Sequence, residues 1–282
     1  MINLFLKYKT KKINNSVPSI ESIRGSKKIL FSIFTRYGDT IIDLVVIKEF
    51  IELYPNKEYL VLCPRQMNPY VNELLPDIKC IPLNKRNLFD MFKVNRTLKK
   101  WRPDIGFNPW SNGLDSCYFL TYCKRYLCYK DFKRPEVINH YQVVRNYLKL
   151  QNKPWKINKL TLKKEYKNIL ICPQSTDPER SISSSQLDEL IIDLNKKYKK
   201  YKLVIASMDS SFFREDIAQF NFEKSSKSSK EFISLVKNID LAICTDSAPL
   251  HIASALEKDL IAIFHITKPE VVINQNTTLL VS

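Results

Sequence analysis

The sequence predicts an α/β protein with two Rossmann-like units, each built around a parallel sheet. Short apolar runs alternate with segments of helical periodicity from 28 to 107, and the alternation restarts from 168 to 264. Such alternation is typical of βαβ units. A polar stretch at 153–167 suits an interdomain linker, and 282 residues with 44% hydrophobic content can form two cores. We expect an N-terminal basic extension at 1–27, an N-terminal domain at 28–160 and a C-terminal domain at 161–282.

The first half begins with an apolar run at 28–34, which predicts a buried strand. A polar loop follows at 35–40, and apolar residues then recur at helical spacing, which predicts a helix ending near Pro55. From 108 to 164 the periodicity weakens and aromatic residues become frequent. The other elements expected in this half are strands at 59–63, 80–83 and 103–107 and helices at 69–75, 89–101 and 141–150.

In the second half the elements repeat the same pattern. The apolar run at 241–244 ends in three small polar residues, and Pro249 falls in the first turn of the helix that follows. That helix is apolar nearly all round, so we expect it to be buried. The remaining expectations are strands at 168–172, 202–207 and 260–264, helices at 184–198, 210–220 and 232–238, and a mobile loop at 223–230.

The composition limits the partners. With 45 Lys+Arg against 29 Asp+Glu, the net charge of +16 favours nucleic acid, an anionic membrane surface or a phosphorylated substrate. No nucleic-acid reader motif is present, and a solvated basic surface accounts for much of the charge. The N-terminal residues 1–12 lack the features of a signal peptide and form either a basic amphipathic helix on a membrane surface or a frayed extension.

Cofactor motifs are also missing. The seven cysteines form no C-x-x-C pair, which favours free thiols in a reducing cytoplasm. There is no G-x-G-x-x-G, P-loop, G-x-S-x-G or D-x-D motif, and there are only three histidines. A dinucleotide cofactor or a metal ion is therefore not indicated, and no apolar run reaches the length of a membrane span.

Three polar loops follow predicted strands, where open α/β folds bind ligands. In the first, Arg36-Tyr37-Gly38-Asp39, the helix end would hold Asp39 ionised as a general base, and Gly38 would allow close approach of a ligand. The alternative is that Asp39 only caps the helix.

The second loop, 173–181, carries Ser175, Thr176 and Arg180, whose hydroxyl and guanidinium groups suit phosphate oxygens; an ordinary Asp-Pro turn is the alternative. In the third loop, Asp246 or Ser247 would cap a helix whose free N–H groups can receive an anion. His251 follows one turn inside that helix and is either a site residue or a satisfied core residue.

Together the three loops resemble the motifs of glycosyltransferase family 9, the lipopolysaccharide heptosyltransferases. T-D-S-A-P-L-H-I-A-S-A resembles the family signature D-S-G-P-x-H-x-A-A-A, and R-Y-G-D resembles its R-x-G-D loop. P-Q-S-T-D-P-E-R-S-I-S resembles its P-G-A-S/T…K-x-W-P loop, with Arg180 at the usual Lys and Ile182 at the Trp. Gln174, Ala248 and His265 stand where the family has Gly.

The resemblance implies a GT-B fold, in which two Rossmann-like domains face each other across a cleft, and an inverting, metal-independent transfer. A sugar such as heptose would pass from a nucleotide sugar such as ADP-heptose to a lipopolysaccharide core or related surface glycan, in the cytoplasm or at the inner membrane. Asp39 would be the catalytic base, with Arg36 and Gly38 on the acceptor side. The donor would be bound by residues of the second and third loops: Ser175, Thr176, Arg180, Thr245, Asp246, Ser247, Ala248 and His251.

Two other functions stay open. The replaced glycines favour a non-catalytic GT-B-like protein that binds a nucleotide sugar or acts as a scaffold. The net charge alone favours a basic module that binds polyanions.

Overall fold

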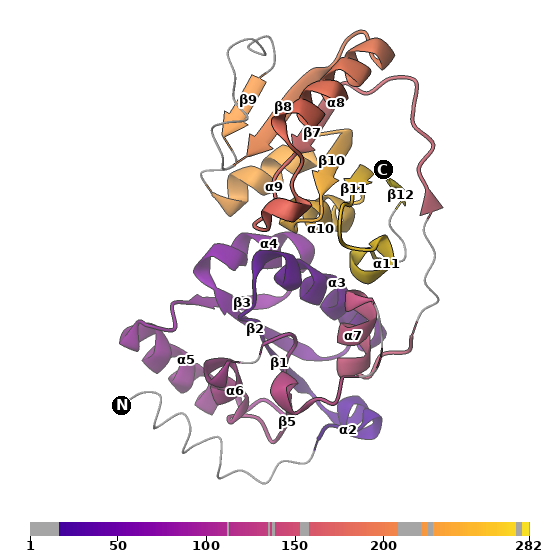
Figure 1. Ribbon diagram of the computed structural model, residues 1–282. Helices are drawn as coiled ribbons and strands as arrows, with labels where there is room; N and C mark the ends of the chain where they lie inside the picture. The colour runs from indigo at the N-terminus through magenta and orange to yellow at the C-terminus, as the bar shows by residue number, and fades with distance from the viewer. Residues whose placement is uncertain are drawn as a thin grey trace. The chain divides into compact units, whose positions relative to one another are not determined.

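The computed structural model describes residues 17–111, 113–134, 136, 139–152, 158–207, 221–224, 228–274 and 278–281. The chain divides into two compact units, 1–152 (unit 1) and 153–282 (unit 2). Each is an α/β unit with a parallel sheet, as the sequence predicts (Figure 1). The expected boundary lay at 160/161; the difference arises because Asn158–Lys159 (β6) pairs with a strand of unit 2.

The described part of unit 1 contains a parallel sheet with the strand order β3-β2-β1-β4-β5. β1 lies at its centre, where Leu30 pairs with Leu60 of β2 and with Gly106 of β4. Phe31 of β1 is fully buried and packs on Phe50 and Phe107, which anchors the sheet in the core. The strands are β1 Lys28–Ser32, β2 Glu58–Pro64, β3 Lys79–Leu83, β4 Ile105–Asn108 and β5 Arg125–Cys128.

In unit 1, α2 precedes the strands, α7 follows the last of them, and the other helices connect them. Their α-helical bounds are α2 Ile20–Gly25, α3 Tyr37–Leu53, α4 Asn68–Leu74, α5 Leu88–Trp101, α6 Leu114–Leu120 and α7 His140–Tyr147. Short 3₁₀ turns lie at Arg65–Met67 (η1) and Tyr129–Asp131 (η2). The buried residues of α3 include two polar ones, Thr40 and Asp43.

In the described part of unit 2, the parallel sheet has the strand order β6-β12-β11-β10-β7-β8-β9. β7 Asn168–Cys172 and β10 Leu241–Thr245 are neighbours, with Ile171 paired to Ile243. The other strands are β8 Lys202–Ser207, β9 Asn221–Lys224, β11 Asp259–Ile263 and β12 Thr278–Val281. The helices are α8 Ser184–Lys197, α9 Ser229–Lys237, α10 Ala248–Ala255 and α11 Pro269–Val272, with a 3₁₀ turn η3 at Pro178–Arg180.

Both sheets have a point where the chain reverses its direction of strand addition. In unit 1 the chain runs from β1 outward through β2 to β3, then returns to the other side of β1 as β4. In unit 2 it runs from β7 through β8 to β9, then returns beside β7 as β10. The carboxyl ends of strands at such a switch point are where open α/β sheets bind ligands. The three loops identified from the sequence follow β1, β7 and β10.

Several elements differ from expectation. α2 lies within the expected N-terminal extension at 1–27. β5 and α6 lie in the segment whose periodicity is weak; β5 pairs with β4, and α6 contacts β1, β4 and β5. The edge strand β9 (Asn221–Lys224) includes the first two residues of the loop expected at 223–230, and α9 starts at Ser229 rather than 232. The helix expected at 210–220 and the N-terminal residues 1–12 lie outside the described residues.

Candidate active site

Asp39 lies in the first turn of α3, which follows the loop after the carboxyl end of β1. The helix begins at Tyr37 with Arg36 at the N-cap position, and no side chain caps this end. Asp39 is therefore not the helix cap that the sequence left open as an alternative. Gly38, the second residue of α3, has no positive φ, so the backbone conformation does not require glycine there.

The carboxyl group of Asp39 is partly buried. Burial raises its pKa above the ordinary value of 3.8, while His140 and, more weakly, Arg36 act in the opposite direction. The sequence predicts that the helix end holds Asp39 ionised. Desolvation outweighs that effect, because the pKa is raised. A carboxyl whose pKa moves toward neutrality is better matched to general base catalysis than an ordinary aspartate.

A second carboxyl group, Asp43, lies one turn further along α3. Asp43 is fully buried, and neither carboxyl oxygen has a hydrogen-bond partner. Burial raises its pKa well above 3.8, and the charge of Asp39 raises it further. Burial and the neighbouring Asp39 charge thus both favour the protonated form of Asp43. The sequence reasoning missed this residue, although the D-x-x-x-D spacing places both carboxyl groups on one face of a helix.

Aromatic rings gather in the same region of unit 1. The ring of Trp110, just after β4, lies 5.4 Å from that of Tyr129 and 5.1 Å from that of His140 (centroid distances). The Arg134 guanidinium lies 5.4 Å from the Trp110 ring. The indole N–H of Trp110 is buried without a hydrogen-bond partner, and the residue has a left-handed backbone with φ 50°. Burial raises the pKa of Tyr129, and the charges of Asp43 and Asp39 add to the effect, so these groups share one electrostatic environment.

α7 holds His140 in place near Asp39. Arg145 of α7 is buried and forms a two-point ion pair with Glu49 of α3, with N–O distances of 2.5 and 2.9 Å. At the end of α7, the Tyr147 hydroxyl contacts the Leu127 carbonyl oxygen. These contacts fix α7 against α3 and the sheet, so the position of its first residue, His140, is set by the fold.

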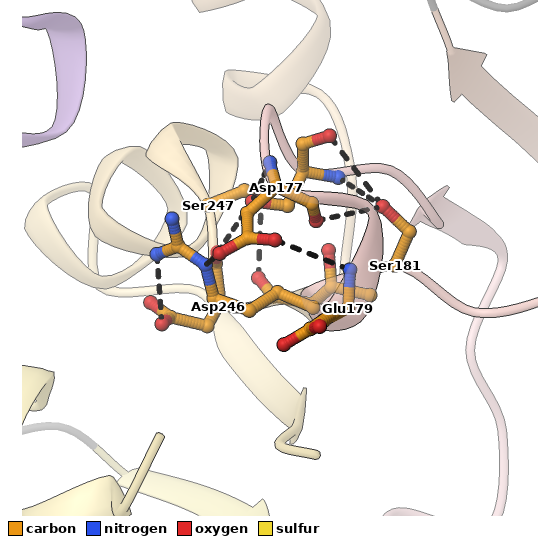
Figure 2. A network of polar contacts seen from close by, with 8 residues as sticks. Asp177, Glu179, Ser181, Asp246 and Ser247 are labelled. Carbon is orange, nitrogen blue, oxygen red and sulfur yellow. Dashed lines mark hydrogen bonds and ion pairs between the residues drawn. The ribbon is translucent and has the colours of Figure 1, made fainter. Parts of the chain in front are cut away.

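In unit 2, the loops after β7 and β10 are joined by hydrogen bonds (Figure 2). The Ser175 hydroxyl donates to the Asp246 carbonyl oxygen at 3.0 Å, and the Ser175 N–H donates to Ser181 Oγ at 2.9 Å. The Ser207 hydroxyl at the end of β8 donates to Gln174 Oε1 at 2.9 Å. The network fixes both loops before any ligand binds, while Thr176 is exposed beside it.

Arg180 lies between two carboxylates of this network. Its Nη1 is 3.2 Å from Asp246 Oδ2, and its Nε is 3.3 Å from Asp177 Oδ2. The Asp246 side chain is 5% exposed and that of Arg180 is 30% exposed, so the carboxylate is shielded from water while the guanidinium stays partly accessible. Sequence reasoning assigned Arg180 and Asp246 separately to a donor site and did not identify Asp177 as a partner.

The first turn of α10 has no side-chain cap, and the prediction that Asp246 or Ser247 caps it is wrong. Ser247 occupies the N-cap position, but its hydroxyl donates to the Thr245 carbonyl oxygen at 3.2 Å, and the Asp246 carboxylate is engaged by Arg180. Thr245 Oγ1 is buried without a hydrogen-bond partner. Ala248 is the first helical residue, and His251 is buried one turn inside the helix.

The predicted residues thus form two groups, each within one unit. Arg36, Gly38 and Asp39 lie together at the start of α3. In unit 2, Asp246 is contacted by Ser175 and by Arg180. Ser247 joins this group through its hydrogen bond to the carbonyl of Thr245, the residue before Asp246. Across the described residues, no cluster of three His, Cys, Asp or Glu side chains is arranged to hold a metal ion. None of the described helices has the length and apolarity needed to span a bilayer.

Solved structures share this fold. ADP-heptose lipopolysaccharide heptosyltransferase II of E. coli is 16% identical, with a TM-score of 0.67 over 90% of this chain and 90% of its own. A glycosyltransferase family 9 protein of Veillonella parvula DSM 2008 is 14% identical, with a TM-score of 0.72 over 95% and 88%. E. coli heptosyltransferase WaaC with ADP is 10% identical, with a TM-score of 0.63 over 90% and 93%. No curated protein sequence matches the chain.

The α/β fold with two parallel sheets is therefore that of GT-B heptosyltransferases. The family model of glycosyltransferase family 9 (heptosyltransferase) matches residues 125–278, more than half of the chain. The match includes the loops after β7 and β10 and the helix that carries His140. The chain belongs to glycosyltransferase family 9, the heptosyltransferase family, and is a glycosyltransferase.

Proposed function

We propose that the protein transfers heptose from an ADP-heptose-type donor to a sugar hydroxyl of a lipopolysaccharide core or a related surface glycan. The transfer inverts the anomeric centre and needs no metal ion. The observation that carries the proposal is the uncapped first turn of α10 beside Arg180. Pro249 has no N–H and the Leu250 N–H donates to the Ser247 carbonyl oxygen at 3.1 Å, so Ala248 provides the backbone donor of this turn. That N–H and a guanidinium together suit the oxygens of a diphosphate. The solved structure of WaaC contains ADP, a diphosphate nucleotide.

In this mechanism the acceptor hydroxyl loses its proton to the Asp39 carboxylate while its oxygen attacks the anomeric carbon. The bond between that carbon and the diphosphate oxygen breaks, and the nucleoside diphosphate leaves with the electron pair. Arg180 and the N-terminus of α10 stabilise the charge that develops on the leaving group. Ser175, Thr176, Thr245, Ala248 and His251 complete the donor site. The reaction requires Asp39 and Arg180 to reach the same pair of substrates.

The groups around Asp39 suit an acceptor. The indole N–H of Trp110 has no partner and can donate to a hydroxyl, while Arg36 and Arg134 can meet phosphate groups of a lipopolysaccharide-type acceptor. Protonated Asp43 limits the negative charge near Asp39, so that only one carboxylate has to be neutralised there. With a net charge of +16, we propose that the enzyme works in the cytoplasm, at the inner membrane that holds the acceptor.

The test is Asp39→Asn, compared with wild type for transfer and for donor binding. We expect turnover to fall by about 10²- to 10⁴-fold because the general base is lost. Stabilisation by the donor should be retained, at about 2.7 kcal/mol for a donor concentration of 100 times the dissociation constant. Wild-type turnover in Asp39→Asn would rule out the base assignment. A product with retained anomeric configuration would rule out direct displacement.

A non-catalytic role in nucleotide-sugar binding is the second candidate. It is favoured by Ala248 at the first position of α10, where a methyl group stands close to the proposed phosphate site. In that case wild type would bind the donor but transfer no sugar to any acceptor of a panel that includes lipopolysaccharide cores.

A further inference from the structure

Among the described residues of unit 1, the large apolar side chains with the highest exposed fractions lie on α5. Leu88, Phe89 and Phe92 are 67%, 87% and 69% exposed. They occupy positions i, i+1 and i+4 of the helix, so they lie on one face. Single exposed apolar residues are ordinary, but two phenylalanines and a leucine within one turn form a patch that calls for a partner.

The opposite face of α5 explains why these residues point outward. Val94 and Leu98 are fully buried in the core cluster that covers one face of the sheet, with Met91 and Trp101 packed against it. Asn87 caps the helix by accepting hydrogen bonds from the N–H groups of Phe89 and Asp90, which fixes where the first turn begins. The helix is thus anchored on one face and presents the other to solvent, as Figure 1 shows for α5 on the outside of the unit.

The exposed face is also basic. Moving along the helix from the aromatic end, Lys93, Arg96, Lys99 and Lys100 are exposed, and Arg86 precedes the helix. The acid of the first turn, Asp90, is engaged by Arg65 at 2.9 Å and accepts the N–H of Asn84 at 2.7 Å. Its charge is therefore offset locally, and the surface remains positive.

We propose that this face of α5 docks on an anionic phospholipid surface, with Leu88, Phe89 and Phe92 inserted among the headgroups. Apolar and aromatic residues on a helix face rich in Lys and Arg are the pattern of interfacial helices. Each basic residue near an anionic leaflet strengthens binding, and the aromatic rings add burial that a soluble polyanion could not offer. The proposal rests on the proposed function for its purpose, which is to hold the enzyme near a lipid-linked acceptor.

The test measures co-sedimentation of the full chain with vesicles of phosphatidylcholine alone or mixed with phosphatidylglycerol. Wild type should bind the anionic vesicles. Phe89→Gln with Phe92→Gln should bind them about tenfold more weakly or worse. Ile192→Gln, which removes an exposed apolar side chain from α8, should bind as wild type does. Equal binding by wild type and the double Phe variant, or no binding by wild type, overturns the proposal.

Two matched double variants distinguish the effect of the lysines on α5 from the effect of the net charge of the protein. Lys93→Gln with Lys99→Gln should lose roughly fivefold in binding for each lysine removed. Lys199→Gln with Lys200→Gln removes the same charge from unit 2 and should change binding little. Equal losses in the two variants would mean that net charge, not α5, holds the protein at the surface, and would overturn the assignment.

Two further readouts keep the docking surface distinct from the active site. The double Phe variant should retain wild-type donor stabilisation and wild-type transfer to a delipidated acceptor. Absence of transfer in wild type itself would count against the proposed function and leave the vesicle result standing. A dimeric wild type that becomes monomeric in the double Phe variant without vesicles would identify the patch as a contact between copies, which overturns the proposal.

Discussion

The candidate site residues of unit 1 and those of unit 2 differ in how their charged groups are paired. In unit 2, Arg180 is paired with two carboxylates, and the loops around it are closed by hydrogen bonds. In unit 1, the Asp43 carboxyl oxygens and the Trp110 indole N–H are buried without hydrogen-bond partners, and burial raises the pKa of Asp39. In unit 2, Thr245 Oγ1 also lacks a partner, but it belongs to an uncharged hydroxyl. Buried unpaired groups cost stability and are retained where they serve chemistry. The contrast supports our proposal that unit 1 transfers the proton and that unit 2 binds the anion.

The cluster formed by Arg180, Asp177 and Asp246 in unit 2 has more negative than positive charge. Arg180 contributes one positive charge, whereas Asp177 and Asp246 together contribute two negative charges. A diphosphate therefore meets a cluster whose cation is already engaged. In the proposed complex the guanidinium exchanges carboxylate contacts for phosphate contacts, while the Ala248 N–H at the start of α10 adds a backbone donor.

Among changes to the loops of unit 2, the largest effect is expected for Arg180→Met. Losing a charged hydrogen-bond donor and leaving two carboxylates beside the diphosphate should weaken donor binding by about 10- to 100-fold. Isothermal titration with the nucleoside diphosphate measures this, and Arg180→Lys should recover part of the affinity. Lys196→Met removes an exposed cation that pairs with Asp193 in the same unit and serves as the control. Unchanged affinity in Arg180→Met would remove anion binding from this loop and erase the contrast between the units.

The next prediction concerns the buried acid of unit 1. Because the pKa of Asp43 is higher in the folded state than its ordinary value of 3.8, the folded protein binds this proton more tightly. Asp43 should therefore make the free energy of unfolding fall as pH rises from about 4 through its raised pKa, by up to about 1.4 kcal/mol per pH unit. Asp43→Asn cannot ionise, so its urea-unfolding free energy should depend less on pH. The difference between the two proteins should be near zero at the acid end of the range and widen toward pH 8.

The charged and titratable groups that face Asp43 bear on this experiment. They are Asp39 on its own helix, Tyr129 in η2 and Tyr147 in α7, with the Arg145–Glu49 pair further along the contact between α3 and α7. All of them are present in both proteins, so their own titrations largely cancel in the difference. If the unfolding free energies of wild type and Asp43→Asn depend on pH in the same way, the pKa of Asp43 is not raised. Asp43 would then not be a second carboxyl group that stays protonated in unit 1.

The sequence predicts the fold well because strand runs and helical periods report burial directly. It also predicts which loops matter, since ligand sites of α/β folds follow the ends of central strands. It does not predict how the loop residues engage one another. The spacing of Asp177, Arg180 and Asp246 carries no sign that both acids lie against one guanidinium, because that contact depends on β7 and β10 being neighbours in the sheet. Similarly, Trp110 and His140 come together only because α7 is anchored to α3.

The smallest effect is expected for Asp177→Asn. Whether nucleoside diphosphate binding becomes tighter or weaker shows whether Asp177 competes with the diphosphate for Arg180 or orients Arg180 for it. Asp177 is 39% exposed, so its pairing with Arg180 is partly screened and should be worth little. Asn can still accept the Glu179 N–H that Asp177 Oδ1 accepts at 3.2 Å, so the turn is retained. Removing one of two competing carboxylates should tighten nucleoside diphosphate binding by about threefold at low salt, and the gain should shrink as salt is added. Asp193→Asn on α8 removes an equal charge from an exposed pair and should leave affinity unchanged. Weaker binding in Asp177→Asn would instead mean that Asp177 orients Arg180 for the diphosphate. The ion pairs of unit 2 would then favour diphosphate binding rather than compete with it.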